Sequence, residues 1–217
     1  MSDTFLPVTP EIVLRAYMHG IFPMAHSRTD PQLEWFDPIR RGVLPLDGFH
    51  QPRRLRRTVK QNRLQVTVDH DFRGTMEACA DEAEDRKSTW ISDRIIELYT
   101  ELNRMGHAHS VETRLDGRLV GGLYGVSIGG AFFGESMFSR VTDASKVALV
   151  HLVARLRIGG YALLDCQFQT EHLAQFGTVE VPRLAYRRQL AAALKVRGNF
   201  HAAPADWPPD AVLDALT

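Results

Sequence analysis

The sequence predicts a mixed α/β fold, in which helices pack against a largely antiparallel sheet, from three observations. Strand-like alternation of apolar and polar residues recurs three times between residues 108 and 138. A helix pattern follows over 143–157, and a short apolar run typical of a buried strand covers 161–165. The 217-residue chain is long enough to bury one sizeable core around such a sheet.

Turn residues separate the three strands of this region, which we predict over 108–114, 119–128 and 131–138. Asp116 with Gly117, and Gly129 with Gly130, are the residue types that tight hairpin turns require. Because consecutive strands joined by tight turns pair antiparallel, we expect a three-stranded meander.

The segment after the meander predicts a helix, a strand and a further helix. Asp143 is placed to cap the helix over 143–157, which Gly159 and Gly160 end. A strand over 161–165 and a helix over 182–192 follow. This order of elements is that of a GNAT-like N-acyltransferase sheet, an analogy that concerns the fold and leaves the function open.

The first forty or so residues differ in pattern from the rest, and we predict a small N-terminal domain over 1–60, before the GNAT-like domain over 61–217. Pro45, Gly48 and Pro52 mark a hinge near the end of the first domain. The other predicted elements are helices over 10–18, 53–61, 72–85 and 93–105 and strands over 33–36 and 64–68.

The composition excludes several classes of protein. The chain is 44% hydrophobic and 24% charged, as globular proteins are, so disorder is not expected. It has no apolar run long enough for a membrane span and no secretory pattern at its start. Cys79 and Cys166 are too few for a disulfide framework. We therefore expect a cytoplasmic protein, able to act as a monomer and without a membrane partner.

The formal net charge is zero, but basic residues gather near one predicted helix. Residues 40–63 contain eight Lys or Arg side chains against Asp47 alone, a local charge of +7. Such a stripe can neutralise nucleic-acid phosphates, and an ordinary solvated helix face fits the charge equally well. The candidates for contact with a nucleic-acid backbone are Arg53, Arg54, Arg56, Arg57, Lys60 and Arg63.

Polar side chains interrupt apolar strands at two points. Glu135 lies near the end of the third meander strand, and Asp165 and Gln167 lie at the end of the strand over 161–165. Polar groups at strand ends line clefts more often than they fill cores, so these residues are candidates for one site. The alternative is that Glu135 and Asp165 are solvated loop residues or salt-bridge partners.

Seven short stretches follow one another along the chain: GIFP (20–23), TWI (89–91), GHAHSVE (106–112), LVGGLYGV (119–126), FFGESMFS (132–139), DASKVAL (143–149) and LDCQ (164–167). In this order they resemble the leucyl/phenylalanyl-tRNA–protein transferases, enzymes of the bacterial N-end rule. With the similarity between them, the resemblance covers residues 10–190 or so.

The resemblance implies transfer of Leu, Phe or Met from aminoacyl-tRNA to the α-amino group of proteins that begin with Arg or Lys. The ester of an aminoacyl-tRNA is already activated, so neither a cofactor nor a metal is expected. The acceptor α-amine has a usual pKa of about 7.7–8.0 and is partly uncharged at neutral pH. Holding amine and carbonyl together can lower the barrier by about 7–11 kcal/mol.

The resemblance also implies an apolar pocket for the aminoacyl side chain and a stacking site for the 3′-terminal adenosine. Trp90 matches the family's stacking tryptophan, whereas Met24 stands where a second tryptophan is common. As residue types alone, the pocket residues fit an ordinary core equally well, and Trp90 fits an anchor for the following helix. The implied pocket residues are Leu123, Phe132, Leu149, Leu152, Leu156 and Leu164.

Three polar residues receive roles as hypotheses. Asp165 would attract the acceptor's ammonium and then orient it or relay its proton. Gln167, whose amide is not basic, would accept a hydrogen bond from the amine or donate one to the oxyanion. Glu135 would pair with the acceptor's ammonium or its basic side chain.

Four other interpretations stay open. A CoA-dependent acetyltransferase has a similar strand order, but residues 139–146 lack the glycines of a pyrophosphate loop. A cysteine hydrolase would use Cys166 with His107, His109 or His172, although a lone cysteine after a strand is usually inert. His107 and His109 could hold a metal, yet no further ligand has a matching spacing. A module that binds tRNA or amino termini without catalysis would keep the same motifs.

Overall fold

The structure, a computed structural model, describes residues 8–81 and 88–217. Its strands are β1 (Phe22–Met24), β2 (Glu34–Phe36), β3 (Arg40–Val43), β4 (Gln65–Val68), β5 (Ala108–Leu115), β6 (Arg118–Ile128), β7 (Ala131–Ser139), β8 (Leu163–Gln167) and β9 (Val179–Pro182). Its helices are α1 (Pro10–Met18), α2 (Arg53–Gln61), α3 (Phe72–Ala80), α4 (Asp93–Arg104), α5 (Ala144–Ile158), α6 (Glu171–Ala174), α7 (Arg183–Ala193) and α8 (Pro209–Asp214). The mixed α/β class is confirmed.

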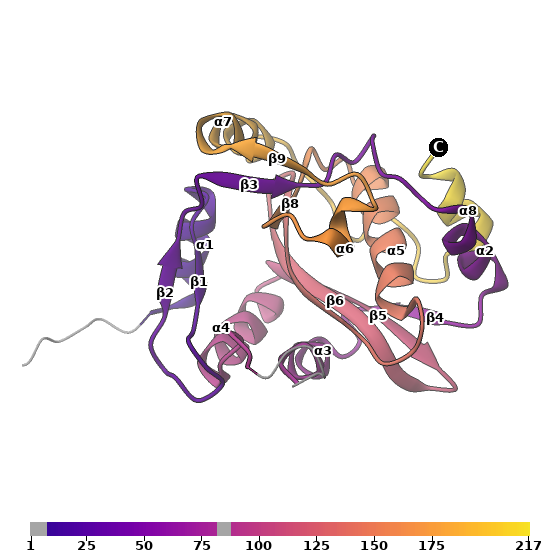
Figure 1. Ribbon diagram of the computed structural model, residues 1–217, viewed down its shortest axis with the longest axis horizontal. Helices are drawn as coiled ribbons and strands as arrows, with labels where there is room; N and C mark the ends of the chain where they lie inside the picture. The colour runs from indigo at the N-terminus through magenta and orange to yellow at the C-terminus, as the bar shows by residue number, and fades with distance from the viewer. Residues whose placement is uncertain (1–7, 82–87) are drawn as a thin grey trace, which may run out of the picture.

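The large sheet has the strand order β4-β5-β6-β7-β8-β3-β9, and β1 pairs with β2 in a separate small sheet (Figure 1). The predicted meander is present, since β5, β6 and β7 pair antiparallel. Asp116 and Gly117 both have positive φ, 50° and 76°, as the tight turn between β5 and β6 requires. Helix α5 then crosses over to β8, which lies parallel to β7.

Three details of the predicted elements differ. The strand predicted over 161–165 lies two residues further along the chain as β8, Leu163–Gln167. Asp143 does not cap α5 with its side chain; its carboxylate accepts hydrogen bonds from Arg54 and Thr58 of α2 instead. The helix predicted over 72–85 ends at Ala80 as α3, and residues 82–85 of that range lie outside the described residues.

Strand β3 was not predicted, and it joins the first part of the chain to the large sheet. Gly42 lies opposite Gln167 of β8, and β9 pairs along the other edge of β3. A Cβ atom on Gly42 would lie 2.7 Å from the carbonyl carbon of Phe168, so only glycine permits this approach. Because β3 falls inside 1–60, the predicted N-terminal domain contributes a strand to the main sheet, and its boundary stays a prediction.

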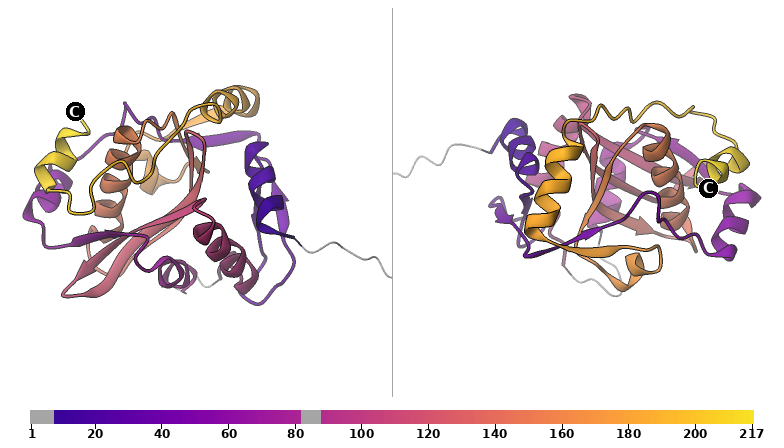
Figure 2. Two further views of the ribbon diagram at one scale, coloured as in Figure 1. Left: turned by 180° about the vertical axis from the view of Figure 1, so that it is seen from behind. Right: turned by 90° about the horizontal axis from the view of Figure 1, so that it is seen from above.

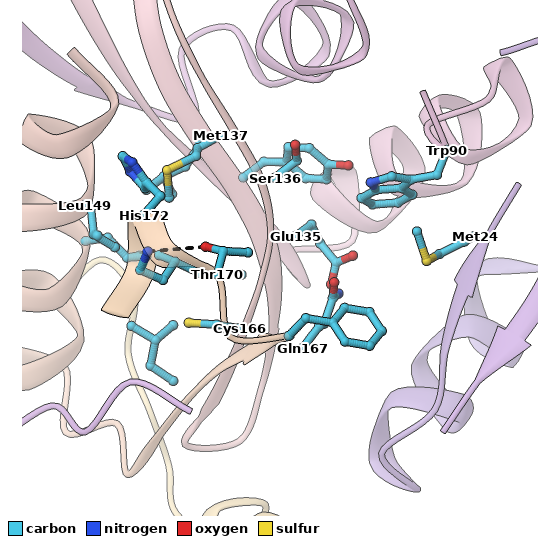
Figure 3. A pocket seen from close by; sticks show the side chains of 17 residues that line it. Met24, Trp90, Glu135, Ser136, Met137, Leu149, Cys166, Gln167, Thr170 and His172 are labelled. Carbon is cyan, nitrogen blue, oxygen red and sulfur yellow. Dashed lines mark hydrogen bonds between the residues drawn. The ribbon is translucent and has the colours of Figure 1, made fainter. Parts of the chain in front are cut away.

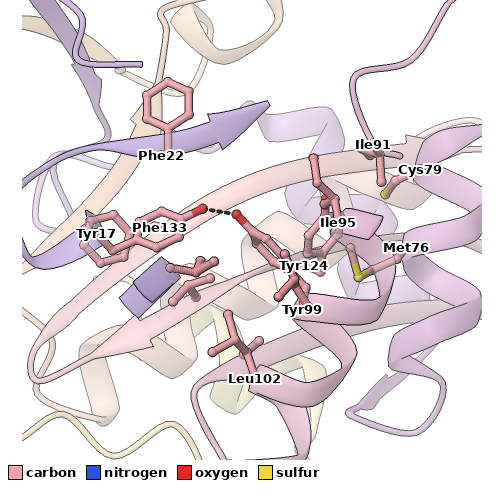
Figure 4. Close-up of a cluster of buried hydrophobic side chains, with 14 of the residues drawn as sticks. Tyr17, Phe22, Met76, Cys79, Ile91, Ile95, Tyr99, Leu102, Tyr124 and Phe133 are labelled. Atoms are coloured by element: carbon pink, nitrogen blue, oxygen red, sulfur yellow. Dashed lines mark hydrogen bonds between the residues drawn. The ribbon is translucent and has the colours of Figure 1, made fainter. Parts of the chain in front are cut away.

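Helices cover both faces of the large sheet (Figure 1; Figure 2). Helices α1, α3, α4 and α7 supply the apolar cluster on one face, where Tyr17, Tyr99, Tyr124 and Phe133 meet (Figure 4). Helices α2, α5 and α8 supply the cluster on the other face. Helix α5 is buried nearly all round, and its buried residues include Ser145 and Arg155 besides the apolar ones. Within the described ranges, no helix combines the length and apolarity needed to cross a bilayer.

Candidate functional site

A cavity of about 430 Å³ opens where β7 and β8 stop pairing. The last paired residues are Phe133 and Asp165, although β7 continues to Ser139 and β8 to Gln167. The separated strand ends leave room for side chains from both, and Figure 3 shows Glu135, Cys166 and Gln167 pointing into that space.

Leucine side chains form one wall of the cavity. Leu123 comes from β6 and Leu164 from β8, and the same face of α5 supplies Leu149 and Leu152. The structure thus brings four of the six predicted pocket residues together. Met137 and Leu173 also line the cavity, although the sequence did not single them out.

The other two predicted pocket residues, Phe132 and Leu156, do not line the cavity. Both side chains are fully buried in the apolar cluster beneath α5. The Phe132 ring stacks on Phe200 with 5.6 Å between ring centroids and a 12° angle between planes. Core packing accounts for these two positions.

Trp90 and Met24 lie close together at the end of the cavity opposite Leu149 (Figure 3). The backbone N–H of Ala25 donates to the Trp90 carbonyl at 3.1 Å, which fixes the end of β1 beside the segment that leads into α4. The predicted stacking pair is therefore assembled from segments more than sixty residues apart in the sequence.

Glu135 owes its position to a β-bulge. Tyr124 lies opposite Ser136 and Gly125 opposite Gly134, so Glu135 is the extra residue between these two pairs. Bulges re-aim a side chain, here away from the regular alternation of β7. The side chain is only 9% exposed, yet it lines the cavity.

The surroundings of Glu135 make it a titratable group near neutrality. Burial raises the pKa of Glu135 to about 7, although the hydrogen bond from Tyr17 and the neighbouring Gln167 amide act to lower it. Tyr17 donates a hydrogen bond to Glu135 Oε1 at 2.7 Å, and its hydroxyl is also hydrogen-bonded to that of Tyr99 (Figure 4). Oε2 is buried and has no partner of hydrogen-bond geometry among the described residues, so its capacity to accept a hydrogen bond is unused.

Asp165 lies behind the cavity wall rather than in it. Its side chain is 0% exposed and is paired with Arg41, which donates from Nε at 2.9 Å and from Nη2 at 2.7 Å. Tyr186 donates a further hydrogen bond at 2.5 Å. Burial acts to lower the pKa of Arg41, but the charge and hydrogen bonds of Asp165 outweigh it and raise that pKa. Both oxygens of Asp165 are therefore occupied by protein groups.

Gln167 is held in an uncommon backbone conformation by Asp165. Its φ is 62°, in the left-handed region that side chains other than glycine rarely adopt. The Gln167 N–H donates to Asp165 Oδ1 at 2.7 Å, which stabilises this turn. The side-chain amide nitrogen is buried in the cavity and has no partner of hydrogen-bond geometry in the described part of the chain. Strained backbone of this kind is concentrated at functional sites.

Cys166 and His172 also line the cavity, whereas His107 and His109 do not. Burial and then the charge of Asp165 raise the pKa of the Cys166 thiol to about 12. Because the thiolate is the nucleophile of cysteine enzymes, Cys166 has the character of an inert wall residue.

Only part of the predicted basic stripe lies on the surface. Arg53, Arg54, Arg57, Lys60 and Arg63 are exposed and Arg56 is half-buried, on or just after α2. Arg54 pairs with Asp143 at 3.1 Å and Lys60 with Asp210 at 2.9 Å. Arg41, which contributed to the local charge of +7, is buried beneath the site and does not belong to this surface.

Comparison with known proteins identifies the chain as an aminoacyltransferase. The family model for leucyl/phenylalanyl-tRNA protein transferase matches residues 43–191, and the model of that protein's N-terminal domain matches residues 7–39. The chain belongs to the leucyl/phenylalanyl-tRNA–protein transferase family, as the resemblance of its motifs predicted.

Individual relatives agree along nearly the whole chain. A leucyl/phenylalanyl-tRNA–protein transferase of Rhodopseudomonas palustris (strain HaA2) is 57% identical over 93% of this chain and 90% of its own length. That of Ruegeria pomeroyi is 53% identical over 98% of this chain and 99% of its own length. Among solved structures, L-PGS from Bacillus licheniformis matches with a TM-score of 0.40 and 14% identity over 76% of this chain and 55% of that one, too distant to assign the fold.

Removal of one member of the buried ion pair should destabilise the protein strongly. Asp165→Asn leaves the Arg41 charge buried without a counter-charge, and we expect the free energy of unfolding to fall by about 3–5 kcal/mol. The control is Arg40→Gln, which breaks the exposed Arg40–Glu180 pair (2.7 Å) one residue away. Exposed pairs contribute about 1 kcal/mol at most. Urea unfolding followed by circular dichroism measures both, and equal losses would contradict the account.

Glu135 should make stability depend on pH. Its pKa is about 7 when folded against a usual 4.5, so the folded state binds more protons between these values. Stability conferred by the protonated carboxyl is therefore present below pH 4.5 and lost as the pH rises to 7. We expect wild type to lose stability relative to Glu135→Gln between pH 5 and 7.5. A difference between the two proteins that is constant over this range would show an ordinary Glu135 pKa.

Proposed function

We propose that this chain transfers Leu, Phe or Met from aminoacyl-tRNA to the α-amino group of proteins that begin with Arg or Lys. The observation that carries the proposal is the cavity itself, which is apolar along α5 and also lined by Glu135 and Gln167. Such a cavity can hold an uncharged side chain beside groups that bind an amine. The acceptor proteins and the cytoplasm as the place of reaction follow from the family's chemistry.

The donor's side chain would occupy the leucine wall formed by Leu149, Leu152 and Leu164. Burying a Leu or Phe side chain there contributes roughly 1.5–3 kcal/mol. A charged side chain would lose its hydration without gaining a counter-charge among these leucines, so charged donors should be refused. Phe132 and Leu156 would support this wall from the core.

The tRNA would contact both Trp90, at one end of the cavity, and the basic residues on and after α2. Its terminal adenine would stack on Trp90, with Met24 on the other side of the base supplying apolar contact in place of a second aromatic ring. Upstream phosphates would meet the basic residues of and after α2, namely Arg53, Arg54, Arg56, Arg57, Lys60 and Arg63. All these groups come from one chain, which is consistent with a monomeric enzyme.

The reaction is aminolysis of the ester. Glu135, with a pKa near 7, would accept a proton from the acceptor's ammonium. The freed amine nitrogen attacks the ester carbonyl carbon. As the amide bond forms and the bond to the 3′-terminal ribose oxygen breaks, the nitrogen loses a further proton, which the departing oxygen gains. The Gln167 amide N–H would stabilise the negative charge that develops on the carbonyl oxygen. Asp165 would act as a positioning residue, because Arg41 already neutralises its charge.

The same features support a GNAT-like assignment of the 61–217 domain. The meander β5–β7, the crossover helix α5 and the parallel strand β8 follow in the expected order, and β7 and β8 part where the cavity opens. The N-terminal domain would then supply the adenine clamp through Met24, and β3 would brace β8.

The direct test of function is incubation with radiolabelled leucyl-tRNA and a peptide that begins with Arg. We expect the label on the peptide, and none on a peptide that begins with Ala. Leu149→Trp should abolish transfer of leucine because the indole fills the cavity, whereas Leu184→Trp, at a 73% exposed site, should have no effect. Stable tRNA binding without transfer would mean a binding module, and transfer from acetyl-CoA would mean an acetyltransferase.

Trp90 should contribute to donor binding by stacking. Trp90→Ala should lower kcat/KM for leucyl-tRNA roughly 5- to 150-fold, the equivalent of about 1–3 kcal/mol per stacked base. Trp90→Phe keeps an aromatic face and should recover most of this loss. If Ala and Phe at this position behave alike, Trp90 anchors α4 and does not bind the base.

A further inference from the structure

Three side chains that can ligate a metal converge away from the cavity. Asp69 follows β4, His109 lies on β5, and His201 comes from the segment between α7 and α8. One ligand atom of each residue lies within 4.8 Å of those of the other two. None of the three lines the cavity between β7 and β8.

Asp69 presents one oxygen to both histidines. Its Oδ2 lies 2.7 Å from His109 Nδ1 and 3.7 Å from His201 Nε2. Its Oδ1 accepts the backbone N–H of Ser110 at 2.8 Å, which fixes the carboxylate. Metal-binding carboxylates and imidazoles are typically held by such outer hydrogen bonds.

The histidines are also held in place. The Phe200 ring stacks on the His109 ring with 4.1 Å between centroids and a 10° angle between planes. Arg155 donates to the carbonyls of Phe200 and Ala203, each at 3.1 Å, so the backbone on both sides of His201 is anchored. The His201 side chain is 64% exposed, which leaves the site open to ions from solvent.

We propose that Asp69, His109 and His201 bind one divalent transition-metal ion of the zinc class. Two imidazole nitrogens and one carboxylate oxygen suit Zn²⁺ and Co²⁺, and water can complete the coordination. Ligand atoms around tetrahedral zinc are separated by about 3.3 Å, and the observed 2.7 and 3.7 Å lie on either side of that value. The ion would take the place of the hydrogen bond between His109 Nδ1 and Asp69 Oδ2, so that both atoms become ligands.

The bound ion would fasten the C-terminal segment to the sheet. Asp69 directly follows β4 and His109 lies on β5, which pairs with β4, whereas His201 is reached only after α7. Binding of an ion to the folded state alone raises stability by mass action. The nearby positive charge of Arg155 opposes the ion, so affinity should be below that of closed zinc sites with four protein ligands.

The test uses the full-length protein freed of metal with a chelator. Co²⁺ should bind with one equivalent and give visible d–d absorption, Zn²⁺ should displace it, and either ion should raise the Tm. His201→Ala should weaken binding at least tenfold or so, in the range typical of a disturbed metal site. The matched control is His70→Ala, an exposed histidine next to Asp69, which should bind as wild type does.

Two results would overturn the proposal. Either Co²⁺ fails to bind stoichiometrically to wild type, or His201→Ala binds it as tightly as wild type does; in both cases the three residues form a hydrogen-bonded cluster only. Because the His201 side chain is exposed, loss of fold is not expected in this variant, and circular dichroism checks it. Peptide labelling by His201→Ala should equal that of wild type, so the outcome is independent of the proposed transfer reaction.

Discussion

The buried ion pair between Arg41 and Asp165 is the interaction on which the rest of the site depends. Arg41 belongs to β3 and Asp165 to β8, and Tyr186 from α7 joins them through its hydroxyl. Arg41 also donates to the carbonyl of Gly20 at 2.9 Å, in the turn after α1. One guanidinium thus connects the N-terminal segment, the central sheet and the last long helix.

Burying two charges gains little net stability over apolar residues of similar size. The ion pair matters more for the positions of the groups around it than for net stability. Asp165 Oδ1 accepts the Gln167 N–H and so holds β8 in a left-handed turn at its last residue. That turn directs the Gln167 amide into the cavity. The ion pair therefore stabilises the unfavourable left-handed conformation of Gln167, at the point where the donor's carbonyl would lie.

The two carboxyl groups of the site are separated in character by their surroundings. Asp165 is neutralised by Arg41, whereas Glu135 is buried against neutral hydroxyls and has its pKa raised to about 7. Carboxyl groups whose environments differ in this way divide acid–base and structural tasks. Of the two carboxyl groups, that of Glu135 is thus the one suited to exchange a proton with an α-amine.

The local part of this architecture could be predicted from the sequence. The meander and α5 follow from alternation, helical spacing and turn residues, all of which act over short distances in the chain. The leucine wall was implied by the family resemblance. The family could be recognised because its motifs are contiguous stretches of sequence, and the family models confirm it. Glu135 and Gln167 were recognised as polar interruptions of apolar strands, although their roles stay predictions.

The long-range part could not be predicted. Strand β3 is four residues long and contains two arginines, so nothing in its own sequence shows that it inserts beside β8. The sequence therefore presents Arg41 as one more charge of the basic stripe, and it leaves open whether Asp165 binds the acceptor's ammonium or forms a salt bridge. The bulge at Glu135 is set by the register between β6 and β7, which no single strand encodes.

The most direct measurement is a crystal structure with a non-hydrolysable 3′-leucyl-adenosine analogue. The account predicts adenine against Trp90, the leucyl side chain along Leu149, and the carbonyl oxygen at the Gln167 amide. It also predicts that Arg41 and Asp165 stay paired as they are in the free protein. An Asp165 carboxylate that leaves Arg41 to contact the ligand directly would contradict it.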